Sequence, residues 1–287
     1  MNRARASLAL LSALPLLLLS ACAEHRPERA PAPPLVAATS PAELALPFDT
    51  YKWTPRETWL QDRARRLLAE RCLADRGIGL KLPDPGDEPP DVHTNDRRYG
   101  VTNVQAAARY GYHLPSMWDE EGGRTRTTGW TRKPSAQEEA ALYGEADRPG
   151  CYQYADSVLA RDVPAADTRW FAGQSAETLE RTETDPAVVR ARTRWKTCMD
   201  EAGHDYAHPR EAIGDARWDL DAPTITEREI ETAQADIRCM RLSGLLSTWH
   251  RAEVTLQRRI IAEHSQKFRD LTIAKHAALR NVLAALE

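Results

Sequence analysis

The chain has 287 residues, of which 42% are hydrophobic and 28% charged, a composition that favours a folded protein over a disordered one. Its 39 basic and 42 acidic residues give a formal net charge of −3, which excludes a strongly basic nucleic-acid-binding protein. This length provides for one large domain or two modest ones.

The first residues have the pattern of a bacterial export signal. Arg3 and Arg5 precede an apolar run from about Leu8 to Leu19, and these 12 residues are too few to span a bilayer. A basic start, a short apolar run and small residues before a cleavage site are typical of a secretory signal peptide. We therefore expect residues 1–21 to be removed on export.

The cleavage site itself resembles the lipobox of bacterial lipoproteins. Leu19-Ser20-Ala21-Cys22 has the small residues and the cysteine of that motif. The resemblance implies that the Cys22 thiol receives a diacylglyceryl group and becomes the first residue of the mature protein. The alternative is an ordinary secreted protein in which Cys22 is incidental.

A lipidated Cys22 predicts attachment to the outer face of the cytoplasmic membrane. Each buried CH₂ group contributes about 0.8 kcal/mol, so two or more acyl chains give a stable anchor. Removal of residues 1–21 takes away two arginines and no acid, which leaves 37 basic residues against 42 acidic ones. Lipid, and not attraction to anionic headgroups, is therefore expected to hold this acidic protein at the membrane.

The stretch that follows Cys22 is rich in proline, and its apolar residues do not recur at helical or strand spacing. The prolines of this stretch are Pro27, Pro31, Pro33, Pro34, Pro41 and Pro47. We expect residues 22–48 to comprise the lipidated cysteine and an extended spacer. Beyond it we expect a loop-rich helical unit at 49–174 and a second helical unit at 175–287.

The mature body has four cysteines, and an even number in an exported chain favours disulfides. They are Cys72, Cys151, Cys198 and Cys239. No two are spaced as C-x-x-C, which excludes a zinc ribbon or a thioredoxin-type motif. Four cysteines allow three pairings.

A short internal sequence repeat, which we call the internal echo, favours one of these pairings. Residues 72–83 (CLADRGIGLKLP) and 198–209 (CMDEAGHDYAHP) both match C-[LM]-x-[DE]-x-G-x5-P. In each, the glycine (Gly77, Gly203) stands where a left-handed residue closes a helix, and the proline discourages its continuation. Unless the echo is a chance match, two equivalent helix-Cys-turn units suggest that each cysteine pairs with the next, as Cys72–Cys151 and Cys198–Cys239.

Helical spacing dominates the body, so the predicted fold class is mainly α, with long irregular loops. Thr54 as N-cap, Pro55 at the first helical position and Glu57 two residues later predict a capping box that opens the first helix. Residues 83–150, rich in Pro, Gly and Asp, are expected to be loops around one helix at about 103–110. Further helices are predicted after Cys151, from Ser175 as N-cap, and from Asp185-Pro186.

The C-terminal stretch 224–287 is free of proline and amphipathic throughout. A helix of roughly 60 residues would measure on the order of 90 Å, more than a compact domain accommodates. It is therefore expected either to break near Gly244 and pack back as a hairpin, or to project as a coiled-coil arm. We expect the apolar stripe from Met240 to Leu286 to be a packing face or a face for a partner.

Three segments resemble a family of uncharacterised actinobacterial (Streptomyces-type) lipoproteins. They are RRYGVTNVQAAARYGYHLP (97–115), WKTCMDEAGHDY (195–206) and ADIRCM (235–240). With the lipobox-like residues, the likeness extends loosely over most of the mature chain. It implies an envelope location and a four-cysteine body, and it implies no activity and no catalytic residue.

Patterns that carry chemistry are weak in this sequence. His204 and His208 form H-x3-H but follow a helix end and have no evident third ligand, while Asp215, Asp219 and Asp221 have no EF-hand spacing. Both groups are interpreted as polar loops. No dinucleotide fingerprint or phosphate-binding loop is present. We accordingly predict no metal, no cofactor and no catalytic residue.

Aromatic residues gather in and near the loop-rich stretch. Candidates for lining a glycan or peptide groove are Tyr99, Tyr110, Tyr112, His113, Trp118 and Trp130. The alternative, which we favour, is that they are buried under a disulfide-tied loop.

The leading hypothesis is a non-catalytic binding or adaptor protein of the cell envelope, whose partner is an envelope protein or a cell-wall polymer. One alternative is a cell-wall-modifying hydrolase that works from the loops at 83–150. A solute receptor of a transporter is a weaker alternative, because such two-lobed receptors alternate strands and helices and this sequence does not.

Overall fold

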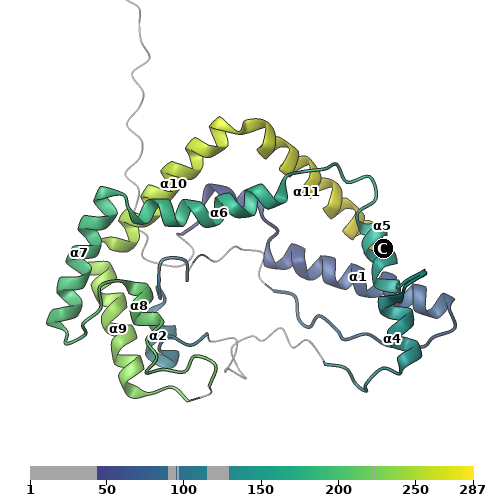
Figure 1. Cartoon of the computed structure of the whole chain (residues 1–287), viewed down its shortest axis with the longest axis horizontal. Coiled ribbons are helices and arrows are strands. Elements are labelled where there is room, and N and C mark those ends of the chain that lie inside the picture. The colour runs from purple at the N-terminus through teal and green to yellow at the C-terminus, as the bar shows by residue number, and fades with distance from the viewer. Residues whose placement is uncertain (1–43, 90–94, 96, 115–128, 223) are drawn as a thin grey trace, which may run out of the picture. The chain divides into compact units, whose positions relative to one another are not determined.

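The computed structural model describes residues 44–89, 95, 97–114, 129–222 and 224–287, all within one compact unit that spans residues 36–287 (Figure 1). Cys22, Trp118 and most of the expected spacer lie outside the described residues. The described part is mainly helical, which confirms the predicted fold class. Its elements are η2 (Pro47–Tyr51), α1 (Pro55–Asp75), α2 (Val104–Tyr110), α4 (Ala136–Tyr143), β1 (Gly144–Glu145), β2 (Arg148–Pro149), α5 (Cys151–Leu159), α6 (Thr168–Glu183), α7 (Pro186–Glu201), α8 (Pro209–Ile213), α9 (Glu227–Leu242), α10 (Leu245–Glu263) and α11 (Ser265–Leu286).

Helix α1 begins as predicted. The Thr54 hydroxyl accepts a hydrogen bond from the Glu57 amide at 3.1 Å, and the Glu57 carboxylate accepts one from the Thr54 amide at 2.8 Å. Two otherwise unpaired amide groups are thereby satisfied, and a cap of this kind stabilises a helix by about 1 kcal/mol.

The internal echo has the same structure in both places. At the end of α1 the Ile78 amide donates to the Leu73 carbonyl, and after α7 the His204 amide donates to the Met199 carbonyl, each at 2.9 Å. The closing glycine has a left-handed φ in both, +74° at Gly77 and +84° in the second copy. Both turns are Schellman motifs, in which a glycine avoids the steric cost that a Cβ atom would impose.

Both predicted disulfides are present. Cys72 of α1 bonds to Cys151 at the start of α5, and Cys198 of α7 bonds to Cys239 of α9. The Cα atoms are 5.6 Å apart in each pair, well within the range of disulfides. The pairing suggested by the echo is therefore confirmed.

Buried apolar residues form three clusters, which we call the first, second and third core. The first core surrounds Cys72–Cys151 and joins α1, α4, α5 and the end of α11, and the second surrounds Cys198–Cys239 and joins α2, α7, α8, α9 and the start of α10. The third core contains Phe48, Phe171 and Phe268, contributed by η2, α6 and α11. The boundary expected at 174/175 lies inside α6, and α11 packs on α1.

The C-terminal stretch forms three helices. The predicted break near Gly244 is confirmed, because this residue has a left-handed φ of +67° between α9 and α10. A second break at His264, which the sequence analysis did not predict, separates α10 from α11. The alternative that this stretch projects as a coiled-coil arm is therefore wrong. Among the described helices, none combines the length and apolarity that crossing a membrane requires.

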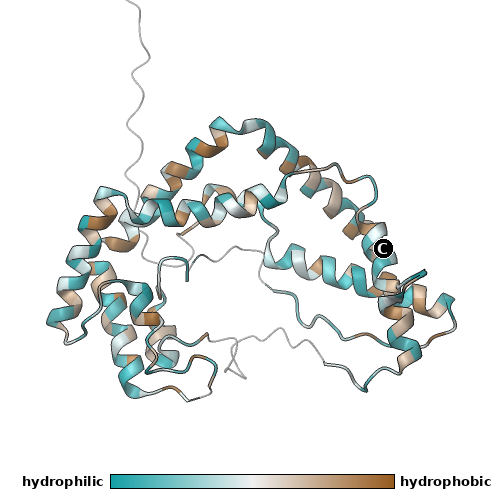
Figure 2. Cartoon of the chain, viewed as in Figure 1, coloured by the Kyte–Doolittle hydropathy of each residue, from teal (hydrophilic) through white to brown (hydrophobic). Residues whose placement is uncertain are grey.

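Many large apolar residues of this stretch are buried inside the chain. Trp249, Ile260, Phe268 and Val282 are all nearly inaccessible to solvent. Figure 2 shows hydrophobic segments alternating with hydrophilic ones along α10 and α11, as expected of helices that bury one face. These buried residues support the packing-face alternative, and they join the three cores.

The loop-rich stretch has more regular structure than predicted. Helix α2 is confirmed, but α4 and the two-stranded antiparallel hairpin of β1 and β2 were not expected. Helix α6 also starts earlier than predicted. Asp167 caps it by accepting a hydrogen bond from the Trp170 amide at 3.1 Å, so Ser175 lies within the helix and is not its N-cap.

The segment before α1 is held firmly to the helical body. Leu44 and Phe48 are fully buried, and the Phe48 amide donates to the Gln257 side chain of α10 at 2.9 Å. The Leu44 carbonyl accepts from the Asn95 amide group, and the Ala45 carbonyl lies 2.9 Å from a His250 ring nitrogen. The start of the described chain is therefore part of the packed structure.

Candidate functional site

The aromatic residues named as candidates for lining a groove are mostly buried, which is the alternative that the sequence favoured. Tyr99, Tyr110, Tyr112 and His113 have almost no exposed surface. Trp130 is 37% exposed, and Trp118 lies outside the described residues. The four buried side chains do not line an open groove, and Tyr99, Tyr112 and His113 instead take part in two buried polar clusters.

The first cluster surrounds Glu253 of α10, which is fully buried. Its carboxylate accepts hydrogen bonds from the Arg98 guanidinium, the Tyr99 hydroxyl at 2.7 Å and the Thr178 hydroxyl at 2.8 Å. Gln257 donates a further bond at 2.9 Å. Burial raises the pKa of Glu253, but the hydrogen bonds and charge of Arg98 outweigh burial and hold this pKa below its ordinary value. The carboxylate is therefore ionised and serves to join α6 and α10.

The second cluster surrounds Glu229 of α9. One of its carboxylate oxygens lies 2.8 Å from both the Tyr112 amide and His113 Nδ1, and His113 Nε2 faces the Asp219 and Ala222 carbonyls. Carbonyl oxygens only accept hydrogen bonds, so Nε2 carries a hydrogen and donates it to them. This pair ties α9 to the turn after α2, where a Cβ on Gly111 would come within 2.6 Å of Glu229.

Asp236, seven residues or about two turns further along the same face of α9, completes this buried region. Its carboxylate accepts a hydrogen bond from the Trp195 indole at 2.9 Å and a longer one from the Tyr112 hydroxyl at 3.3 Å. Burial without a cation raises the pKa of Asp236 to about 7, and the two hydrogen bonds offset this only in part. Its protonation therefore changes near neutral pH.

This titration predicts how stability depends on pH. The pKa of Asp236 rises from 3.8 to about 7 on folding, so the folded protein binds the proton more tightly. The stabilising contribution is complete below pH 3.8 and is lost as the pH rises through 7, with a slope of up to about 1.4 kcal/mol per pH unit. Asp236→Asn is expected to remove this slope in urea unfolding, while the exposed Asp221→Asn keeps it. An equal slope in both variants would contradict the assignment.

The remaining polar candidates have structural roles. His208 Nδ1 accepts a hydrogen bond from the Arg210 amide and caps α8, and Asp215 accepts bonds from Arg217 and the Tyr206 hydroxyl. His204 Nδ1 lies 3.3 Å from the Thr232 hydroxyl. Across the residues that the structure describes, no three His, Cys, Asp or Glu side chains gather to hold a metal ion.

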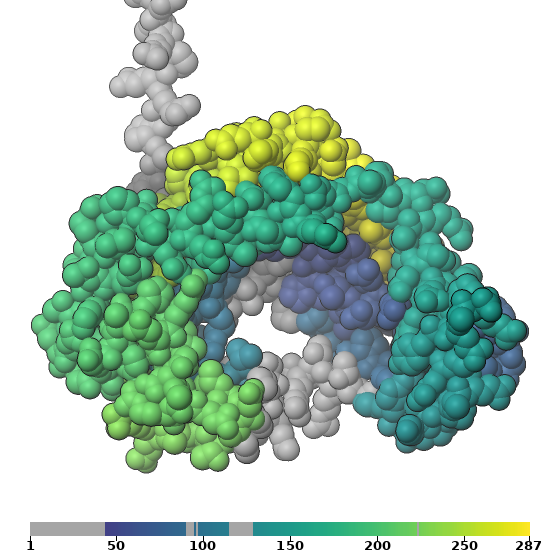
Figure 3. Space-filling view, in the orientation of Figure 1, coloured from purple at the N-terminus to yellow at the C-terminus, as the bar shows by residue number. Residues whose placement is uncertain are grey.

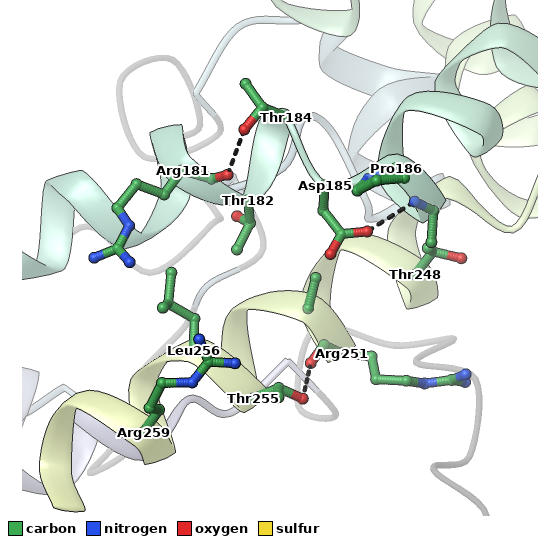
Figure 4. A pocket seen from close by; sticks show the side chains of 12 residues that line it. Arg181, Thr182, Thr184, Asp185, Pro186, Thr248, Arg251, Thr255, Leu256 and Arg259 are labelled. Carbon is green, nitrogen blue, oxygen red and sulfur yellow. Dashed lines mark hydrogen bonds between the residues drawn. The ribbon is translucent and has the colours of Figure 1, made fainter. Parts of the chain in front are cut away.

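The candidate functional site is a solvent-open groove where the junction of α6 and α7 faces α10 (Figure 4). Helices α6 and α10 lie side by side at the surface (Figure 3). The groove has a volume of about 530 Å³. We call it the arginine groove, and its lining is Arg181, Thr182, Thr184, Asp185, Pro186, Ala187, Thr248, Arg251, Ala252, Thr255, Leu256 and Arg259.

Regular helix geometry builds one wall of the arginine groove. The residues that α10 contributes recur at intervals of three and four, which places them on one face of the helix. The opposite wall is the tight junction in which Asp185 caps α7 by accepting a hydrogen bond from the Ala187 amide at 2.7 Å, with Pro186 at the first helical position. Both walls are therefore rigid without a ligand.

The charges of the arginine groove are unbalanced. Arg181 lies 3.4 Å from Glu177, but among the described residues no acid is within ion-pair distance of Arg251 or Arg259. The lining contains a single carboxylate, Asp185, and it is engaged at the N-terminus of α7. Figure 4 shows Arg181 and Arg259 on the same side of the groove, with Arg251 extending toward its other end. The arrangement favours an anionic ligand.

Sequence reasoning missed this groove. It did not single out Arg181, Arg251 or Arg259 as site residues. The spacing of charged and hydroxyl residues along α10 was a signal, but the α6–α7 junction that completes the groove lies about 60 residues earlier in the chain.

Comparisons with known proteins gave no match to a family model, to a curated protein or to a solved structure. The function of the arginine groove is therefore argued from the residues of this chain alone.

Proposed function

We propose that the chain is a lipid-anchored, extracytoplasmic protein that acts by binding, as a non-catalytic adaptor of an actinobacterial cell envelope. The export pattern, the lipobox-like residues 19–22 and the proline-rich stretch support the location. Two disulfides also favour an oxidising compartment. The observation that carries the binding function is the arginine groove.

The groove supports binding because its charge is opposite to that of the protein as a whole. The mature chain is acidic, yet the lining contains three arginines and one engaged carboxylate. A local positive potential on an acidic body attracts anionic groups to one place on its surface. An adaptor needs this kind of selectivity for one partner.

The location is tested by Cys22→Ala. Without the thiol no diacylglyceryl group is attached, so the variant is expected to move almost entirely from the membrane fraction to the soluble extracytoplasmic fraction. The measurement is immunoblotting of fractionated source cells, with Ser40→Ala in the expected spacer as the matched control. Retention of the Cys22→Ala variant in the membrane fraction would contradict the anchor.

The binding function is tested by crosslinking in intact cells, affinity purification and mass spectrometry. One envelope component should be recovered with the unmodified protein and lost with the Arg251→Gln/Arg259→Gln variant. Equal recovery with both proteins would show that the arginine groove is not the binding site.

The described residues offer no specific observation in favour of the alternatives. A hydrolase working from residues 83–150 would use acids or histidines that converge beside Trp118 and Trp130, and Trp118 lies outside the described residues. A two-lobed solute receptor does not fit a mainly helical body whose described strands form one short hairpin. Binding through the arginine groove is therefore the function we carry forward.

A further inference from the structure

We infer that the arginine groove binds a polyol-phosphate polymer, a chain of hydroxyl-bearing units joined by phosphodiesters. This inference rests on the proposed binding function and names the chemical class of its ligand. Three features of the groove carry it: the placement of its charges, the hydroxyl oxygens of its walls and the composition of its apolar part.

The charges are spaced for a ligand with repeated negative groups. Arg251 and Arg259 are eight residues apart on α10, which corresponds to about 12 Å along the helix axis. Arg181 adds a second guanidinium at the Arg259 side (Figure 4). A planar guanidinium binds the oxygens of a phosphate through two parallel hydrogen bonds. A polymer with a phosphate in every unit can place one at each end of the groove.

Between the arginines, the walls of the groove present hydroxyl oxygens that can accept hydrogen bonds from a ligand. The Thr184 and Thr255 hydroxyls donate their hydrogens to the Arg181 and Arg251 carbonyls, both at 2.9 Å. Each hydroxyl oxygen keeps a lone pair for a donor from the ligand. The hydroxyl groups of a polyol supply such donors in the same units that carry the phosphates.

The apolar part of the groove distinguishes this ligand from an acidic peptide. Among the described residues that line the groove, Leu256 is the only large aliphatic side chain and none is aromatic. Peptide and protein partners usually bind through a buried apolar or aromatic anchor, for which this groove has no pocket. The recessed position of the site also favours a flexible chain over the flat surface of a bilayer.

The test is a calorimetric titration of the full mature protein, with its disulfides intact, using a short synthetic glycerol-phosphate oligomer as the probe. Arg251→Gln/Arg259→Gln is expected to weaken binding about tenfold or more, because two charge-assisted contacts are lost at an exposed site. The matched control is Arg190→Gln/Arg258→Gln, which removes the same charge from two exposed arginines outside the groove. This control is expected to bind within about twofold of the unmodified protein.

Four results would overturn the inference. They are no binding of the oligomer, an equal loss in the groove and control variants, equally tight binding of a polyglutamate of the same charge, and a preference for anionic phospholipid vesicles. The titration needs no anchor and the fractionation of Cys22→Ala needs no ligand, so failure of the ligand class is distinguishable from failure of the proposed location.

Discussion

Arg98→Met is expected to lower the free energy of unfolding by about 3–5 kcal/mol, because it leaves the Glu253 carboxylate buried without its cation. Glu253 is 0% exposed at its side chain and Arg98 15% exposed, so water cannot replace the lost guanidinium. The Tyr99 and Thr178 hydroxyls still donate to the carboxylate, but they bring no charge. The loss is measured by urea unfolding at constant pH.

The matched control for this prediction is Arg65→Met. Arg65 also makes two hydrogen bonds to one carboxylate, that of Asp156, at 2.6 and 3.0 Å. These side chains are 37% and 54% exposed, so the control is expected to cost no more than about 1 kcal/mol. Adding Glu253→Gln to Arg98→Met removes the stranded charge and should recover part of the stability. Equal losses in the Arg98 and Arg65 variants would contradict the argument.

Removal of the first disulfide is expected to have an effect of similar size. Cys72→Ala/Cys151→Ala releases a loop of 79 residues, which costs about 4–5 kcal/mol through the entropy of the unfolded chain. The loss also falls on the first core, where α1 and α5 make the most extensive packing contact between helices. A large decrease in thermal unfolding temperature should result.

The second disulfide provides the comparison. Cys198→Ala/Cys239→Ala opens a loop of 41 residues, for which the same relation gives about 4 kcal/mol. Titration of free thiols in the unfolded, unreduced mature protein should find none of the four cysteines reactive. Four reactive thiols would refute both bridges, and an unchanged unfolding temperature in either variant would show that its bridge does not stabilise the fold.

Features set by short-range sequence were predictable. The capping box at Thr54, the left-handed turns at Gly77 and Gly203 and the break at Gly244 each depend on residues within one or two helical turns. The disulfide pairing followed from the same local signal, since two equal turns placed two cysteines in equivalent positions. Local chemistry determines such features, so one sequence is sufficient to find them.

Features set by packing between distant segments were not predictable. The break at His264 has no glycine or proline, and it lies where Ile260 of α10 and Phe268 of α11 both reach the third core. The burial of Tyr99 and Tyr112 depends on carboxylates of Glu253 and Asp236, more than 120 residues further along the chain. The sequence favoured burial of these residues, but it did not indicate which buried groups they would contact.

The arginine groove was missed for the same physical reason. Its α10 wall has a regular pattern that also fits an ordinary solvated helix face. Only the opposing α6–α7 junction, with Asp185 engaged as a cap, turns this face into a recess with unbalanced charge. The sequence thus contained the charges of the site but not its concavity.

The firm attachment of residues 44–48 has a mechanical consequence for a tethered protein. Under the proposed anchor, any tension between membrane and partner is applied to the folded body at Leu44, which is fully buried. The load passes through the Asn95, His250 and Gln257 hydrogen bonds into the middle of the helical body, and not into a free helix end that could peel away. The arginine groove is also on α10, so force between tether and ligand passes through Leu44 of the second core and this one helix.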